Sequence, residues 1–153
     1  IILASAQSNP SGIVVDSTHV YWTNVGGGQV MKIPLGGGTL VTLASAMSSP
    51  FDIVVDSTHA YWTNSGGEVM MVPLAGGTLV TLASAVNGPL AIAVDSTHVY
   101  WTSSGGEVKK TPIVGGASIT LALAQSTPSG IVVDSTHVYW TNWGTDDVVK
   151  VPK

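Results

Sequence analysis

One short segment recurs four times at a nearly constant interval. DSTHVYWTN occupies residues 16–24 and returns, intact or nearly so, from residues 56, 95 and 134, at steps of 40, 39 and 39 residues. A fixed period of about 40 residues is typical of repeat proteins in which each repeat is one supersecondary unit. The repeated signature consists of Asp16, His19 and Trp22, Asp56, His59 and Trp62, Asp95, His98 and Trp101, and Asp134, His137 and Trp140.

The repeat divides the whole chain. A length of 153 residues is enough for one domain with a substantial core. We therefore expect a single domain over 1–153, with repeats at about 7–46, 47–85, 86–124 and 125–153, the last of them completed by 1–6. A proline precedes the aspartate of every repeat by six residues, and the one-residue differences in repeat length fall in glycine-rich turns.

The composition excludes several classes of partner. Apolar residues make up 44% of the chain and charged residues only 9%, there is no arginine, and the net charge is −4. No basic face for nucleic acid can be assembled from five lysines, and no apolar run is long enough to cross a membrane. Cysteine is absent, which removes disulfides and thiolate chemistry. The low-charge surface, rich in Ser, Thr, Gly and Asn, favours a secreted or cell-surface bacterial protein.

Each repeat contains four short apolar runs separated by turn signals. In the first repeat they are GIVVD, HVYWTN, QVMKIPL and TLVTLASA, and none shows a helical period. The DSTH tetrapeptide suits a hairpin turn in which the aspartate side chain accepts hydrogen bonds from backbone amides. Four strands and an aromatic signature in about 40 residues are typical of a β-propeller blade. The sequence therefore predicts an all-β propeller with four four-stranded blades.

The aromatic motif supports this fold by resemblance. VYWTN after VDSTH, with AYWTN and VYWTS as variants, resembles the YWTD-type and NHL-type propeller repeats along the whole chain. The fourth letter of the motif is Asn24, Asn64, Ser103 or Asn142 and never the family's aspartate. The resemblance also implies an alternative function, because such propellers resemble lyases and lactonases that hold a divalent cation near the channel.

The two chain ends suggest how the ring closes. Residues 1–6, IILASA, match the end of the fourth strand at 41–46, whereas the sequence after the last repeat signature stops in the third strand. We expect the N-terminal strand to close the last blade. The outer strands carry small and medium side chains, so the blades should be shallow wedges. This favours two chains forming an eight-bladed ring, a homodimer, with a four-bladed monomer as the alternative.

Residues that differ between repeats are the better candidates for a ligand site. Four equal copies of an Asp/His pair are expected to serve architecture, so we predict no catalytic residues and no metal site among them. The loops entering the first strand and leaving the second should emerge at the same end of the ring, where propellers hold ligands. The individual residues in those loops are Phe51, Asp52, Leu90, Trp143, Asp146 and Asp147.

These residues lead to three hypotheses about function. The first is a non-enzymatic binding or interaction module for a glycan or a protein, with Trp143 stacking on a sugar and nearby carboxylates accepting its hydroxyl protons. No cofactor is expected in that case, apart from a weak Ca²⁺ site at the same carboxylates. The second is the metal-dependent lyase or lactonase that the resemblance implies. The third is a fragment of a longer repeat array, or an engineered scaffold without a ligand.

Overall fold

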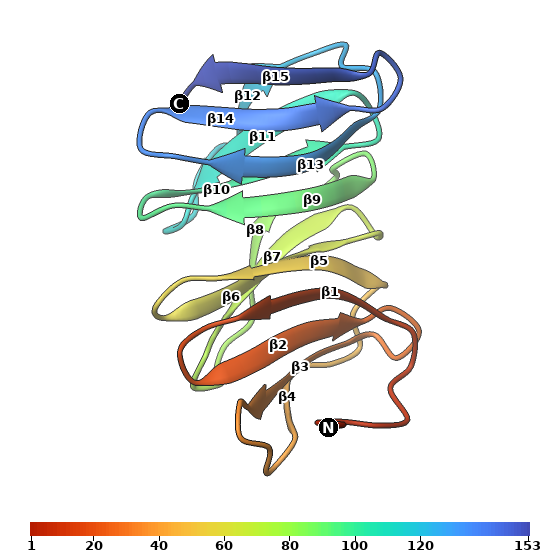
Figure 1. Cartoon of the computed structure of the whole chain (residues 1–153). Helices are drawn as coiled ribbons and strands as arrows, with labels where there is room; N and C mark the ends of the chain where they lie inside the picture. The colour runs from red at the N-terminus through yellow and green to blue at the C-terminus, as the bar shows by residue number, and fades with distance from the viewer.

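The computed structural model describes residues 1–153 as fifteen strands and no helix (Figure 1). There is accordingly no helix long and apolar enough to cross a membrane. The strands are β1 (Pro10–Val15), β2 (His19–Asn24), β3 (Gln29–Pro34), β4 (Val41–Ala44), β5 (Pro50–Val55), β6 (His59–Asn64), β7 (Glu68–Pro73), β8 (Val80–Ala83), β9 (Pro89–Val94), β10 (His98–Ser103), β11 (Glu107–Pro112), β12 (Ile119–Ala122), β13 (Pro128–Val133), β14 (His137–Asn142) and β15 (Asp147–Pro152).

Each repeat forms its own antiparallel sheet. Blade 1 is β1-β2-β3-β4, blade 2 is β5-β6-β7-β8, blade 3 is β9-β10-β11-β12, and blade 4 is the three-stranded sheet β13-β14-β15. Neighbours in the chain are neighbours in the sheet because every connection is a short turn. The predicted all-β propeller architecture is confirmed at this level.

The second strand of each blade supplies the packing between blades. Tyr61 and Trp62 are adjacent in β6 and therefore point to opposite faces of blade 2. Trp62 packs in one cluster with Tyr21 of blade 1, and Tyr61 packs in the next with Trp101 of blade 3. We call the two sides of a blade its Trp face and its Tyr face. At each of the three contacts between blades, the Trp face of one blade meets the Tyr face of the blade that precedes it.

The four blades form an open arc. In Figure 1, β1, β5, β9 and β13 run side by side, and blades 1 and 4 extend from them in opposite directions. Ile13 on the Trp face of blade 1 is 70% exposed, and Val132 on the Tyr face of blade 4 is 64% exposed. These exposed fractions show that blade 4 does not pack on blade 1. The single chain is therefore not a closed four-bladed ring.

The expected closure of the last blade by the N-terminal strand is wrong for the single chain. Residues 1–9 form no strand and lie against blade 1, where Ala4 packs on Trp22, and blade 4 keeps three strands. The reason is geometric. The N-terminal residues lead directly into β1, while β15 lies at the other end of the arc (Figure 1).

Candidate functional site

The repeated DSTH turns have the same hydrogen bonds in every blade. In blade 2, Asp56 Oδ1 accepts the amide of Thr58 at 2.6 Å, its hydroxyl at 2.8 Å and the amide of His59 at 2.8 Å. Asp56 Oδ2 accepts the hydroxyl of Tyr61 at 2.7 Å. The carboxylate thus holds the turn closed and fixes the tyrosine of the next strand. The turn hydrogen bonds expected from the sequence are present.

These contacts also shift the pKa values of Asp56 and Tyr61. Partial burial alone would raise the pKa of Asp56, but the hydrogen bonds from Tyr61, Thr58 and His59 outweigh it and hold that pKa below its ordinary value. Burial, together with the hydrogen bond to Asp56 and its negative charge, raises the pKa of Tyr61 well above the usual value. At neutral pH the pair is a carboxylate and a neutral phenol, so neither group is prepared to transfer a proton.

The repeated histidines stay within their own blades. His59 Nδ1 lies 2.8 Å from the Thr58 hydroxyl, and its ring is tilted at 44° to that of Tyr61. The other three histidines make the same contacts with the same neighbours. No three His, Cys, Asp or Glu side chains come together in an arrangement that could hold a metal ion. The signature residues therefore do not converge on one site.

The variable loops lie at one end of the arc, as their sequence positions suggested. In blade 4 the amide of Trp143, after β14, donates to the carbonyl of Thr127, before β13, at 3.1 Å, and the amide of Gly144 donates to Ser126. The corresponding pairs of loops are hydrogen-bonded in blades 1, 2 and 3 as well. The end opposite the DSTH turns thus presents the loops that enter the first strand and leave the second strand of each blade.

Three of the candidate ligand residues lie together at the start of the inner strands. Phe51, Asp52 and Leu90 line a groove of about 370 Å³ at the end of the arc opposite the DSTH turns, which we call the mouth of the arc. Sequence analysis did not single out the other residues of this groove, because they are small and carry no chemical signal: Ser11, Gly12, Ala91, Ser129 and Gly130. All four inner strands contribute to the groove, so it belongs to the arc as a whole.

Asp52 is tied into the fold although no other repeat has an acid there. Its Oδ1 accepts the amide of Ile53, and its Oδ2 accepts the amide of Ile92 in blade 3, both at 3.0 Å. Burial raises the pKa of Asp52, and the two backbone hydrogen bonds oppose that effect only in part. Each oxygen already has one partner, and the carboxylate bridges two blades.

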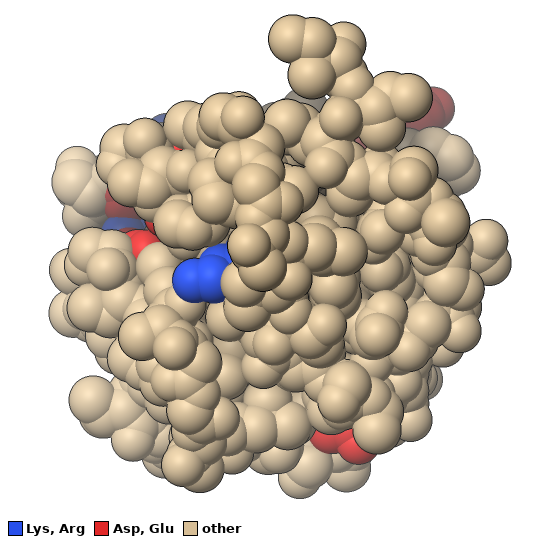
Figure 2. Space-filling view, turned by 90° about the horizontal axis from the view of Figure 1, so that it is seen from below, with Lys and Arg blue, Asp and Glu red and all other residues tan.

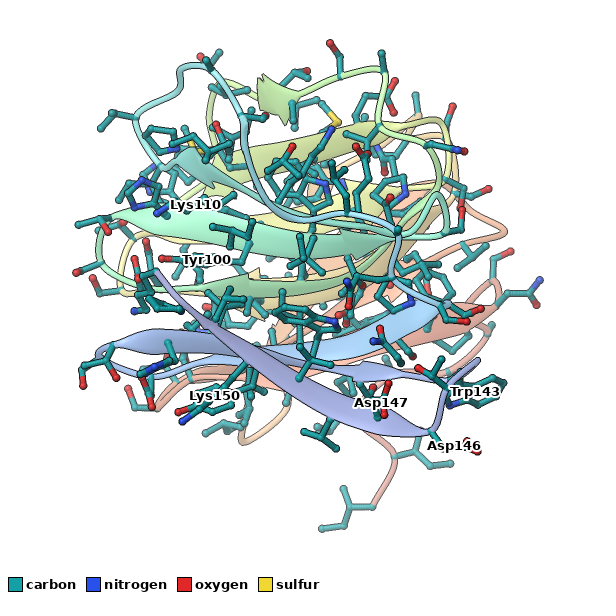
Figure 3. The ribbon with its side chains drawn as sticks, turned by 90° about the horizontal axis from the view of Figure 1, so that it is seen from above. Tyr100, Lys110, Trp143, Asp146, Asp147 and Lys150 are labelled. Carbon is teal, nitrogen blue, oxygen red and sulfur yellow. The ribbon has the colours of Figure 1, made fainter.

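The other three candidates form a separate group where the turn after β14 leads into β15, with Asp147 the first residue of that strand. Trp143 is 79% exposed, and the side chains of Asp146 and Asp147 are also exposed. Figure 3 shows all three at one end of blade 4, with Lys150 toward the other end of β15. This turn offers an aromatic ring and two carboxylates without partners elsewhere in the fold.

One repeated residue has a role that the sequence interpretation missed. The Thr63 hydroxyl accepts the amide of Asp52 at 3.2 Å within blade 2 and donates to the carbonyl of Leu90 in blade 3 at 2.7 Å. Thr23 and Thr102 form the same bridge to the next blade. The signal was a threonine after every repeated tryptophan, which could as well have been ascribed to β propensity.

Comparisons with known proteins define the fold and nothing finer. No protein-family model matches the chain, and no curated protein matches it. Among solved structures, a chain of the nidogen/laminin complex aligns with a TM-score of 0.85 and 20% identity, over 97% of this chain and 61% of that chain. The computationally designed Ika4 protein aligns with a TM-score of 0.87 and 16% identity, over 99% of this chain and 95% of that chain.

An enzyme is among the structural neighbours as well. Virginiamycin B lyase from Staphylococcus aureus aligns with a TM-score of 0.74 and 16% identity, over all of this chain and 58% of that chain. The chain thus spans about three fifths of this lyase and of the nidogen/laminin chain, with shares of 58% and 61%. At such low identities the likeness establishes a propeller repeat fold. The neighbours include an interaction protein, a designed protein and an enzyme.

Proposed function

We propose that the chain is a non-enzymatic binding module that uses the turn between β14 and β15 to bind a glycan. The observation that carries this proposal is the position of Trp143, which is 79% exposed at the same end of blade 4 as the exposed Asp146 and Asp147 (Figure 3). The corresponding residues in the other repeats are Val25, Ser65 and Ser104, so the fold does not require an aromatic ring there.

The chemistry of the turn suits a sugar. An indole ring can stack on the apolar face of a pyranose, and carboxylates accept hydrogen bonds from its hydroxyl groups. The same carboxylates could also take a Ca²⁺ ion, for which oxygen ligands are preferred. The repeated aspartates are already hydrogen-bonded within their turns. We further propose that the repeats are of the YWTD or NHL type and that the protein acts in a secreted or cell-surface setting.

A glycan array tests the proposal directly. We expect the wild-type protein to bind a subset of glycans and Trp143→Ala to weaken that binding by roughly 30-fold or more, the effect of removing an aromatic hot spot worth about 2 kcal/mol. The matched control is Val114→Ala, which truncates an 89% exposed side chain in a turn of blade 3. Glycan binding that survives Trp143→Ala unchanged would count against the site.

A lyase-like enzyme is the second candidate, and Asp52 is the residue that favours it. This carboxyl has a raised pKa and lines the groove at the mouth of the arc. Its two oxygens, however, already accept backbone amides. Metal content measured by mass spectrometry after dialysis separates the two candidates, because bound metal lost in Asp52→Asn would favour the enzyme and contradict a purely binding role.

A further inference from the structure

Blade 1 has a Trp face without a preceding blade. Ile13 on this face is 70% exposed, whereas its counterparts Ile53, Ile92 and Ile131 are 2%, 3% and 7% exposed. Between the N-terminal segment and this face lies an apolar groove of about 470 Å³, lined in part by Ile13 and Trp22. The side chains are the same as at the internal interfaces, and only the partner is missing.

Blade 4 has the complementary Tyr face, also without a partner. Val148 on β15 is 78% exposed, while Val30, Val69 and Val108 at the corresponding places are fully buried, at 0%. Val132, Tyr139 and Val148 line a groove of about 290 Å³ on this face. Exposed contiguous apolar surface of this kind marks an interaction site in soluble proteins.

The bridging threonine of blade 4, Thr141, has no following blade to which it can donate a hydrogen bond. Thr141 Oγ1 accepts the amide of Gly130 at 3.1 Å, as the other bridging threonines do within their blades. Those threonines are fully buried and also donate to a carbonyl of the following blade, but Thr141 is exposed and donates to none. By repeat correspondence with Leu90, the carbonyl that would accept its proton is that of Ser11 in blade 1.

The N-terminal segment already follows the path of a fourth strand from an absent blade. Ala6 has φ 55°, matching φ 54° at Ala124, which precedes blade 4 in the same way. Gln7 Oε1 accepts the indole N–H of Trp22 at 3.1 Å, as Gln125 Oε1 does for the tryptophan of blade 4 at 3.0 Å. Residues 1–9 are thus placed on blade 1 as if a further blade preceded it.

We propose that a second copy of this chain docks head to tail, with its blade 1 Trp face on the blade 4 Tyr face, and that two such contacts close an eight-bladed ring. The arc has a suitable shape, because blades 1 and 4 extend in opposite directions from the inner strands (Figure 1). Two identical arcs related by a two-fold axis then satisfy both open faces at once.

The charges on the molecule favour another copy of the chain over an acidic or basic partner. Viewed from the side of blade 1, the surface carries few charged side chains, with acidic atoms only near the margin (Figure 2). On the Tyr face of blade 4 the charged residues are one acid and one base, Asp134, whose Oδ2 accepts the Tyr139 hydroxyl at 2.7 Å, and Lys150. The counterpart of Lys150 in blade 1, Lys32, donates to the carbonyl of Leu74 in the next blade at 2.6 Å. Lys150 would meet the carbonyl of Leu35 of the second copy in the same way.

The second copy would also complete blade 4. β15 is an edge strand, so its outer backbone N–H and C=O groups can pair with a strand of another chain. Within one chain the N-terminal segment lies at the opposite end of the arc from β15 (Figure 1), so the segment that reaches β15 would come from the second copy. The register of β3 with β4 pairs Met31 with Thr42, so the corresponding pair across the dimer is Val149 with Ile2 of the second copy.

One residue departs from the internal pattern. Asp146, at φ 55°, occupies the place of Gly28, Gly67 and Gly106, where an added Cβ would lie 2.5 to 2.8 Å from a carbonyl oxygen of the following segment. The second copy's Gln7 carbonyl would meet this Cβ, so the loop must shift locally on closure. Removing the Cβ should therefore tighten the dimer.

The mass in solution is the first test. Sedimentation equilibrium should give about 31 kDa, twice the 15.6 kDa of the chain. Val148→Asp should give a folded monomer, because that side chain is exposed in the single chain, whereas Val114→Asp, at an equally exposed turn, should keep the dimer. If the wild-type protein is a monomer, the proposal that a second copy covers the two open faces is wrong. Further repeats of a longer chain would then be what covers them. A dimer untouched by Val148→Asp, or a mass that keeps rising with concentration, would overturn the ring.

A pair of double-cysteine variants and the single variant Asp146→Gly then test the register. In blade 1 the corresponding side chains are Met31 and Thr42, and the Thr42 hydroxyl lies 3.4 Å from the Met31 sulfur. Ile2→Cys with Val149→Cys in this cysteine-free chain should therefore give a disulfide-linked dimer on oxidation. Ile2→Cys with Val114→Cys should not. Asp146→Gly should lower the dimer dissociation constant by about tenfold, roughly the 1.4 kcal/mol expected for relief of one close contact. A weaker dimer with Asp146→Gly would contradict the proposed register.

Discussion

Trp62 and Trp143 are the same side chain in opposite surroundings. Trp62 is fully buried between blades 1 and 2, and its indole N–H donates to Asn64 Oδ1 at 3.1 Å. Trp143 is 79% exposed in the turn between β14 and β15. The first occurs in every repeat and the second in only one. The difference teaches that residues shared by all repeats hold the blades together, while residues found once are free for other roles.

The largest expected effect is the loss of stability when the buried tryptophan, Trp62, is truncated. Trp62→Ala removes a large side chain from the core and leaves a cavity, so we expect it to lower the free energy of unfolding by about 3–5 kcal/mol. Trp143→Ala should change stability by no more than about 0.5 kcal/mol, as is usual for an exposed residue. Denaturant titrations of both variants measure the two values. Equal losses would show that Trp143 also packs in the folded protein.

The aspartates give a smaller version of the same contrast. Asp56→Ala removes four hydrogen bonds from a DSTH turn and should cost about 1–3 kcal/mol, because water replaces part of what is lost. Asp147→Ala removes an exposed carboxylate and should lie within about 0.5 kcal/mol of the wild type. Thermal unfolding followed by circular dichroism compares them. An equally stable Asp56→Ala protein would refute the structural role of the turn.

The smallest expected effect is on the pH dependence of stability. The pKa of Asp56 is lowered in the folded state, so its contribution is present above the unfolded pKa of about 3.9 and is lost as the pH falls below that value. The pKa of Asp52 is raised, so its contribution has the opposite sign and grows as the pH falls. Between about pH 5 and about pH 3, Asp56→Asn should therefore lose less stability than the wild type, and Asp52→Asn should lose more. Urea titrations across this range would reveal the opposite order if the assignment is wrong.

Much of the fold could be predicted from the sequence because the repeat states it four times. The strand pattern, the DSTH hairpin turns and the burial of the repeated Trp follow from period and local chemistry, as does the burial of Tyr21, Tyr61 and Tyr100. The closure of blade 4 by residues 1–6 could not be predicted correctly, because matching sequences show which strand type a segment belongs to and not which blade it reaches. The candidate ligand residues likewise separate into two groups that their loop positions did not distinguish.

The sequence by itself determined what one blade is and which of its side chains face the neighbouring blades, since alternation along a strand sends Tyr61 and Trp62 to opposite sides. Only the tertiary structure decided how the blades add up. The angle between adjacent blades results from the packing of many side chains at once, and no single residue encodes it. That angle leaves the chain as an open arc, with Ile13 and Val148 exposed at its two ends.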